Sequence, residues 1–127
     1  MDNRAQFIEN LQAMLDRRWN ANEWTKFEHL SVYLRVSERM LAHSRVRCVQ
    51  IANVSTSEPY QRKGSFTRMV EVIKSITSLP IYVENVHNYE FRDTLLRHGY
   101  VAARSLDGVV VDLILPRDRE IQDTFTT

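Results

Sequence analysis

The sequence predicts an α/β (α+β) domain in which a mixed central sheet is flanked by helices. Three observations lead to this fold class. Helix-like and strand-like stretches alternate along the chain, residues 30–36 alternate strictly between apolar and polar, and Asp107-Gly108 is a strong signal for a hairpin. The order helix, strands, helix, strand, helix and two strands is typical of a sheet covered by helices.

Size and composition agree with one folded domain. The chain has 127 residues, of which 43% are hydrophobic and 26% charged, and its formal net charge is +1. We predict a single domain over residues 1–116 and a polar tail over residues 117–127. The single cysteine, Cys48, favours a reducing cytoplasm, and no stretch has the roughly 20 apolar residues of a membrane span. The four histidines lack metal-ligand spacing, so we expect no metal site.

The first half of the chain predicts a helix and then two strands. Apolar residues recur at helical spacing over residues 3–19, with Trp19 as the last member of the stripe and Asp2 or Asn3 as the cap. Residues 20–27 are interpreted as a turn or a second short helix with Asn22 as its candidate cap. Residues 30–36 form a strand, which residues 39–42 either continue or follow as a separate strand. After a turn at residues 43–45, residues 46–55 form the next strand.

The second half predicts two helices and three strands. Residues 64–77 are helical, and residues 81–86 form a short apolar strand of the kind found inside a sheet. Asn88 caps a helix that runs to about His98, and Gly99 ends it. Two strands, residues 100–104 and 109–115, complete the fold.

Residues 49–66 are the most informative segment of the chain. An apolar strand runs into a polar loop that contains Arg62, Lys63 and Gly64, and an amphipathic helix follows at once. Backbone N–H groups at a helix start have no intrahelical partner and lie at the positive end of the helix dipole. Gly64 permits a positive φ and the close approach of an anion, while the two basic residues add charge. The segment predicts a phosphate-binding loop, with a plain strand–loop–helix connection as the alternative.

Two motifs give the chain a resemblance to a known family. Residues 61–66 fit the pattern Gln/Arg-x-x-Gly-x-Gly/Ala at every position except the last, where Phe66 stands. Asn88 follows a strand and precedes a helix that ends in Gly99-Tyr100. In this order and spacing, the segment of residues 28–115 resembles the GNAT superfamily of N-acetyltransferases. That fold usually opens with a strand, so either the first strand is absent or residues 20–30 form an unusual version of it. The chain resembles a trimmed member, of the kind that phages encode.

The resemblance implies that acetyl-CoA binds where two central strands separate. Backbone groups at the end of the family's fourth strand bind the pantetheine arm and polarise the acetyl carbonyl, and by position these belong to Ala52, Asn53, Val54 and Ser55. The loop amides bind the pyrophosphate, and these belong to Gln61, Arg62, Lys63, Gly64, Ser65 and Phe66. Asn88 touches the cofactor arm in this interpretation, and a simple helix cap is an equal and compatible one. The bulk of Phe66 bears on how closely the pyrophosphate approaches.

Acetyl transfer also needs a base for the amine and an acid for the departing thiolate. Glu84, at the end of a predicted strand, is the candidate base, with Glu58 second; an ordinary strand-end charge paired with an arginine is the alternative. The family often has a tyrosine that acts as general acid where this chain has Leu95, and leucine cannot donate a proton. Either the acid comes from elsewhere, with Tyr89 as the candidate and His87 nearby, or the thiolate leaves with the help of solvent.

The resemblance implies an acetyl-CoA-dependent N-acyltransferase that acts on an amine of a small molecule or a protein. The alternative is a non-catalytic GNAT-like module that works through protein–protein contact, which the missing tyrosine favours. Nucleic acid is a weaker third partner, because the sequence interleaves no aromatic residues with its basic cluster of Arg45, Arg47, Arg62, Lys63 and Arg68. A final strand at the sheet edge would allow a homodimer. We expect no membrane partner and a cytoplasmic location, the host cytoplasm if a phage encodes the chain.

Overall fold

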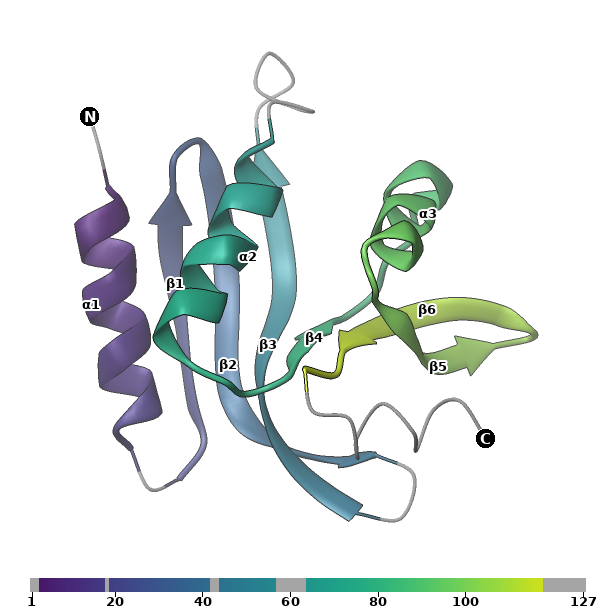
Figure 1. Cartoon of the computed structure of the whole chain (residues 1–127), viewed down its shortest axis with the longest axis horizontal. Helices are drawn as coiled ribbons and strands as arrows, with labels where there is room; N and C mark the ends of the chain where they lie inside the picture. Colours follow the sequence, from purple (N-terminus) through teal and green to yellow (C-terminus); the bar gives the residue numbers. More distant parts are fainter. Residues whose placement is uncertain (1–2, 18, 42–43, 57–63, 118–127) are drawn as a thin grey trace.

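The structure, a computed structural model, describes residues 3–17, 19–41, 44–56 and 64–117. It contains one mixed sheet of six strands, flanked by helices, as the sequence predicts (Figure 1). The elements in chain order are α1 (Arg4–Leu15), β1 (Ala21–Phe27), β2 (Leu30–Leu41), β3 (Ser44–Thr56), α2 (Ser65–Ile76), β4 (Ile81–Val83), α3 (Tyr89–Arg97), β5 (Val101–Leu106) and β6 (Val109–Leu115). The strand order across the sheet is β1-β2-β3-β4-β6-β5.

The three N-terminal strands form an antiparallel meander. β1 pairs with β2 from Ala21↔Val36 to Phe27↔Leu30, and β2 pairs with β3 along its whole length. β2 is one continuous strand of 12 residues, which settles the alternative that the sequence left open. Its alternate residues are buried against the helices because successive side chains of a strand point to opposite faces.

The C-terminal strands are arranged differently from our prediction. β4 runs parallel to β3, and β6 lies between β4 and β5, so the final strand is not at the sheet edge. The edge strand is β5, which is mostly exposed, whereas β6 carries a run of four buried residues, 111–114. A strand that is buried on both faces gains most from an inner position, which explains why the two strands of the hairpin lie in this order.

All three helices contribute buried residues to one core on one face of the sheet. α1 provides Phe7, Leu11 and Met14, α2 provides three further residues, and α3 provides Leu95. The opposite face carries a second, smaller apolar cluster of Leu41, Cys48, Tyr82 and Ile114. Burial raises the pKa of the Cys48 thiol to about 11, so this cysteine behaves as a small apolar residue.

Two predictions for the N-terminal third were wrong. Residues 20–27 form strand β1 rather than a turn or helix, because pairing with β2 supplies hydrogen bonds that the local pattern does not reveal. The first helix ends at Leu15, and Trp19 lies beyond it with 75% of its surface exposed. Asn3 is the N-cap residue of α1, but its side chain contacts the backbone of Glu28 instead of the helix amides.

Turns and caps in the second half follow the sequence closely. Asp107 and Gly108 have φ values of 51° and 80°, as a two-residue hairpin turn between β5 and β6 requires. The side chain of Asn88 accepts a hydrogen bond from the Phe91 amide at 2.9 Å, so the cap of α3 is confirmed. Strand β4 stops at Val83, three residues earlier than predicted.

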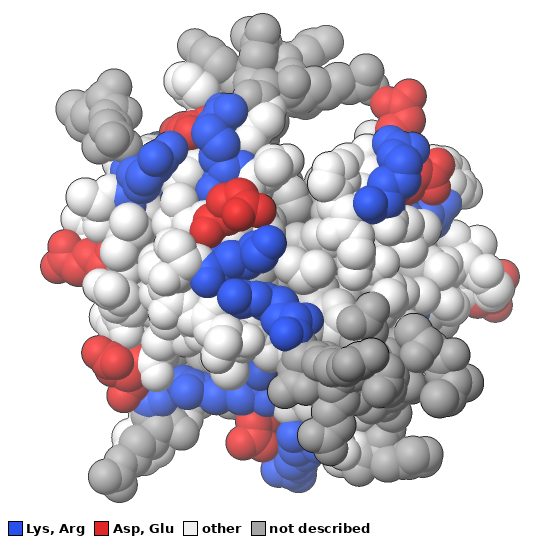
Figure 2. Space-filling model, in the orientation of Figure 1, with Lys and Arg blue, Asp and Glu red and all other residues white. Residues whose placement is uncertain are grey.

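The face that carries α1 and α2 shows no extended patch of one charge. Lysine and arginine side chains lie among aspartates and glutamates over this face (Figure 2). Within the described ranges, no helix is both long and apolar enough to cross a membrane.

Candidate active site

The candidate site lies where β3 and β4 separate. Their parallel pairing covers three residue pairs and ends at Ile51↔Val83, after which the Glu84 amide donates to the Ile51 carbonyl at 3.1 Å. β3 continues to Thr56, while the chain after Val83 follows β6, with a bond from the Val86 amide to Val111. The two central strands therefore diverge just beyond Ile51.

A β-bulge marks the same point of β3. Tyr33 pairs with Asn53 and Leu34 pairs with Ile51, so Ala52 is the extra residue. Bulges occur frequently next to active sites, where they redirect the backbone. The structure thus places all four residues predicted to hold the pantetheine arm beyond the last β3–β4 pair. These are Ala52, Asn53, Val54 and Ser55.

The predicted phosphate loop is described only at its C-terminal end. Gln61, Arg62 and Lys63, like the second-choice base Glu58, lie outside the described residues. Gly64 has φ +80° and precedes α2, whose N-terminus has no side-chain cap among the residues described here. A Cβ at Gly64 would lie 3.1 Å from the Arg68 guanidinium, so both the backbone angle and the space favour glycine.

A carboxylate lies beside this helix start. Ser65 donates to Glu28 at 2.7 Å, and Arg68 donates to both Glu28 oxygens at 2.8 Å and 2.6 Å. The hydrogen bond from Arg68, followed by that from Ser65, lowers the pKa of Glu28 to about 2, although partial burial opposes the shift. Glu28 gave no signal in the sequence because Ser65 and Arg68 lie 37 and 40 residues away.

The last position of the loop motif contacts α3. The ring of Phe66 meets the ring of Phe91 edge-on, with 4.9 Å between their centroids. The first turn of α2 is therefore packed against α3, and Asn88, predicted to touch the cofactor arm, lies at the start of the same helix.

The predicted acid lies at the start of α3, and the predicted base follows the end of β4. Tyr89 begins α3 with 66% of its surface exposed, and its ring lies 4.3 Å from the Arg92 guanidinium. No hydrogen bond joins it to Glu84 among the described residues. Leu95, at the position of the family's tyrosine, is 3% exposed and belongs to the core.

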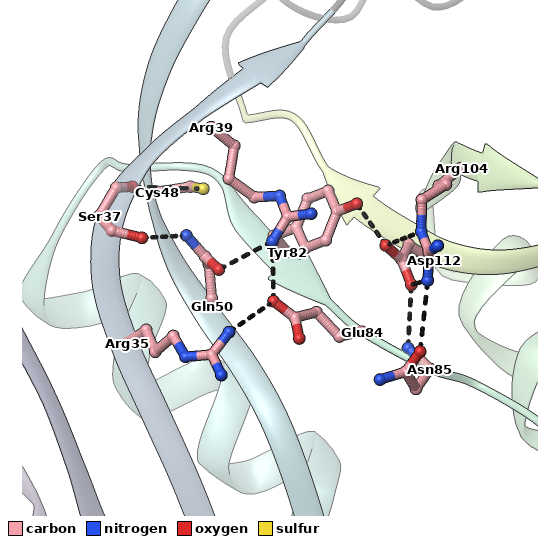
Figure 3. A network of polar contacts seen from close by, with 10 residues as sticks. All are labelled: Arg35, Ser37, Arg39, Cys48, Gln50, Tyr82, Glu84, Asn85, Arg104 and Asp112. Carbon is pink, nitrogen blue, oxygen red and sulfur yellow. Dashed lines mark hydrogen bonds and ion pairs between the residues drawn. The ribbon is translucent and has the colours of Figure 1, made fainter.

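Glu84 lies on the sheet face opposite the main core, in a polar network (Figure 3). Its oxygen Oε1 accepts from Arg39 at 2.8 Å and from Arg35 at 3.2 Å. Arg39 also donates to Gln50 at 3.1 Å and lies 4.1 Å over the ring of Tyr82. Sequence reasoning allowed for an arginine partner of Glu84, and the structure supplies two.

A second part of this network was missed by the sequence analysis. Asp112 is 1% exposed and accepts from the Tyr82 hydroxyl at 2.5 Å, from Arg104 at 2.8 Å and from the Asn85 amide at 2.9 Å. Burial alone would raise the pKa of Asp112, but the bonds from Arg104 and Tyr82 bring it below its usual value. Burial and this carboxylate both raise the pKa of Tyr82. The network fixes Asn85, which has φ 55°, directly after Glu84.

Two further features of the described chain bear on ligands. A hollow of about 360 Å³ is lined by Asn20, Glu38, Arg39, Met40 and Arg45, none of which was predicted as a site residue. In the described ranges, no group of three or more His, Cys, Asp or Glu residues is placed to hold a metal ion.

Comparison with known proteins identifies the fold. KacTA, solved as a DNA complex, has a TM-score of 0.54 at 15% identity and covers 96% of this chain and 83% of its own. A variant of the AtaT toxin bound to the C-terminus of the antitoxin AtaR has a TM-score of 0.52 at 15% identity and covers 77% of this chain. The same AtaT complex with acetyl-CoA has a TM-score of 0.51. This chain spans 64% of the AtaT chain.

AtaT and KacT are toxins with the GNAT acetyltransferase fold, and this chain therefore has that fold. No protein-family model matches the sequence, and no curated protein matches it. β3 and β4 are the strands that the sequence analysis matched to the family's fourth and fifth strands.

Proposed function

We propose that this protein is an acetyl-CoA-dependent N-acyltransferase that acetylates an amine of a small molecule or a protein. The observation that carries the proposal is the separation of β3 and β4 at Ile51, with a bulge at Ala52 and the start of α2 nearby in the fold. The GNAT fold and the AtaT complex with acetyl-CoA support the same cofactor.

The residues around the point where β3 and β4 separate have different roles in the proposed reaction. Acetyl-CoA is the co-substrate and supplies the activated acyl group. The backbone of residues 52–55 holds the pantetheine arm, and the amides of the loop that ends at Gly64 hold the pyrophosphate. Glu84 accepts a proton from the amine through Oε2, directly or through water. The amine nitrogen bonds to the acyl carbon, the carbon–sulfur bond breaks, and the released thiolate takes a proton from solvent.

Acetyl-CoA titration of a matched pair of glycine variants tests this proposal. Gly64 and Gly108 both have φ +80°, but only Gly64 lies at the predicted phosphate loop, and nothing lies within 4 Å of a Cβ at Gly108. We expect Gly64→Val to reduce acetyl-CoA affinity at least about tenfold, because it removes close approach of the anion. Gly108→Val is expected to leave the affinity unchanged. Equal effects of both variants, or no acetyl-CoA binding by the unmodified protein, would overturn the proposal.

A second function rests on Leu95. Because a buried leucine replaces the family's acidic tyrosine, we propose as the alternative a non-catalytic module that acts through protein contact. AtaT in complex with the C-terminus of its antitoxin shows that this fold accommodates a protein partner. Acetyl-CoA binding without acetyl transfer to any amine in a broad panel would favour the module over the enzyme.

We further propose that the domain of residues 1–116 acts in the reducing cytoplasm. The single cysteine of the chain, Cys48, is buried, which agrees with a structural role that needs no disulfide. If two copies associate, the exposed edge strand β5 is the segment that would pair, since β6 is already paired on both sides.

A further inference from the structure

Arg35 and Glu84 form an ion pair in which both partners retain bonding capacity. Both arginine bonds to Glu84 use Oε1, and Oε2 accepts no hydrogen bond from any described residue. Arg35 donates through Nη1 to Glu84, and its other nitrogens donate to no described residue. In Figure 3, the second oxygen of Glu84 and the outer nitrogen of Arg35 lie on the same side of the pair. An acceptor and a donor are thus presented together.

The charge of this cluster favours one kind of ligand. Arg35 and Arg39 bring two positive charges and Glu84 brings one negative charge, so the formal sum is +1. A simple amine in its cationic form adds a like charge. An amine that also carries a carboxylate adds no net charge as a zwitterion and a single negative charge in its reactive, deprotonated form. The cluster therefore favours an acceptor with a carboxylate beside its amine.

The distances suit an α-amino acid. Glu84 and Arg35 are joined by a bond of 3.2 Å, so ligands of Oε2 and of the outer Arg35 nitrogen lie within a few ångströms of one another. The amino and carboxylate groups of an α-amino acid are separated by one carbon atom. A carboxylate also matches the planar fork of a guanidinium.

An aromatic surface lies next to this pair. Trp24 and Tyr33 are direct cross-strand partners with ring centroids 5.1 Å apart, and Trp24 is 57% exposed. The Arg35 guanidinium lies 5.4 Å from the ring of Tyr33, and the two residues share one face of β2 because they are two positions apart. A flat apolar side chain that extends from Arg35 toward β1 would pack on these rings.

We propose, on the basis of the proposed transferase function, that the acceptor is a free α-amino acid with an aromatic side chain. Glu84 Oε2 binds its amino group, Arg35 binds its carboxylate, and Trp24 with Tyr33 packs against its ring. Glu84 directly follows the last β3–β4 pair, and its amide is bonded to Ile51. The amino group of the acceptor would therefore lie next to residues 52–55, whose backbone is assigned to the acetyl carbonyl.

Calorimetric titration with four matched compounds tests the proposal without any variant. The compounds are L-phenylalanine, its methyl ester, phenethylamine and L-alanine, each titrated with and without CoA. We expect L-phenylalanine to bind at least about tenfold more tightly than the ester and phenethylamine, since a charge-assisted hydrogen bond is lost in both. L-Alanine is expected to bind more weakly because it lacks the ring.

Variants assign the preference to the named residues. Arg35→Gln is expected to remove the preference for the free carboxylate, so that L-phenylalanine and its methyl ester bind with equal affinity. Arg97→Gln, at an exposed arginine of α3, is the control and is expected to change nothing. Trp24→Ala is expected to weaken L-phenylalanine but not L-alanine.

Equal affinities for the acid, the ester and the amine would overturn the inference, as would tighter binding of an aromatic peptide than of the free amino acid. Acetyl-CoA binding is measured separately, so the two proposals fail in different ways. Acetyl-CoA binding without amino-acid binding overturns this inference alone, whereas amino-acid binding without acetyl-CoA binding overturns the transferase proposal.

Discussion

Glu28 and Glu84 both form ion pairs with arginine side chains, but they differ in how many of their carboxylate oxygens accept hydrogen bonds. Both oxygens of Glu28 are used, by Arg68, Ser65 and Arg4. Glu84 uses a single oxygen for its two arginines. A carboxylate with every lone pair directed at its own chain stabilises the fold, whereas one with an open oxygen can bind a ligand.

The surroundings of the two residues strengthen the contrast. Glu28 lies in the β1–β2 turn with φ 53°, and both its amide and its carbonyl are bonded to the Asn3 side chain. It therefore connects α1, the turn and α2. Glu84 lies at the point where two strands separate; its side chain is less exposed than that of Glu28, 12% against 24%, so the open oxygen and not exposure distinguishes it. We infer that Glu28 is structural and that Glu84 is functional.

The largest effect is expected from Glu84→Gln. If Glu84 is the base, kcat/KM for acetyl transfer falls by about 10²–10⁴-fold. The free energy of unfolding changes by less than about 1 kcal/mol, because glutamine keeps an acceptor for partly exposed arginines. Steady-state kinetics and urea unfolding measure the two quantities. A stability loss without an activity loss would reverse the assignment of the two glutamates.

Glu28→Ala is expected to lower the free energy of unfolding by about 1–3 kcal/mol, because several charge-assisted hydrogen bonds are lost. The matched control is Glu9→Ala, at an exposed position of α1, which should stay within about 0.5 kcal/mol of the unmodified protein. Equal unfolding midpoints in urea for the two variants would show that the Glu28 network contributes nothing.

Lowering the pH should remove the stabilisation that Glu28 gives to the folded protein. The pKa of Glu28 is about 2 in the folded protein and near 4.5 when unperturbed, so the unfolded chain binds more protons between these values. The stabilisation by Glu28 is complete above pH 4.5 and is lost as the pH falls toward 2. Urea unfolding at stepwise lower pH should therefore show a steeper loss for the unmodified protein than for Glu28→Gln. Parallel curves would contradict the shifted pKa.

Phe66→Ala is expected to have a smaller effect, with opposite signs for stability and binding. Loss of the edge contact with Phe91 costs about 1 kcal/mol of stability. The smaller side chain restores the residue type of the family's loop, so acetyl-CoA affinity should rise by up to about tenfold. Calorimetry with Phe66→Leu as the bulky control distinguishes extra space from a general loosening. Reduced affinity would show that Phe66 itself contacts the cofactor.

Tyr89→Phe should have the smallest effect. Because Tyr89 is 66% exposed and lies against Arg92, we expect kcat to change by less than about twofold. The pH–rate profile is the decisive measurement, since loss of its alkaline limb in the variant would identify Tyr89 as the proton donor after all.

The elements that bury apolar residues, and the turn between the last two strands, could be predicted from local sequence patterns. The alternation along residues 30–36, the helical stripe that includes Met69 and Ile73, and the Asp107-Gly108 turn depend on neighbours in sequence. β1 could not be predicted in this way, because two of its three inward residues, Ala21 and Thr25, carry little apolar signal.

The polar contacts of the candidate site depend on segments that are distant in sequence, and they could not be predicted from local patterns. The contacts of Arg35 and Arg39 with Glu84 join positions 49 and 45 residues apart, and they exist only because β2, β3 and β4 are neighbours in the sheet. The motif of residues 61–66 predicts a ligand at the start of α2, which stays a prediction. It contained no information on Glu28, which reaches the same helix start from the β1–β2 turn.

The position of β6 has a consequence for how the protein emerges from the ribosome. The β1–β3 meander contains only neighbours in sequence and can form while translation continues. β4 is three residues long and is held on its second side by β6, the last strand of the described residues. The half of the sheet that includes Glu84 must therefore wait until Leu115 has left the exit tunnel, so the β1–β3 meander can form before the proposed site is complete.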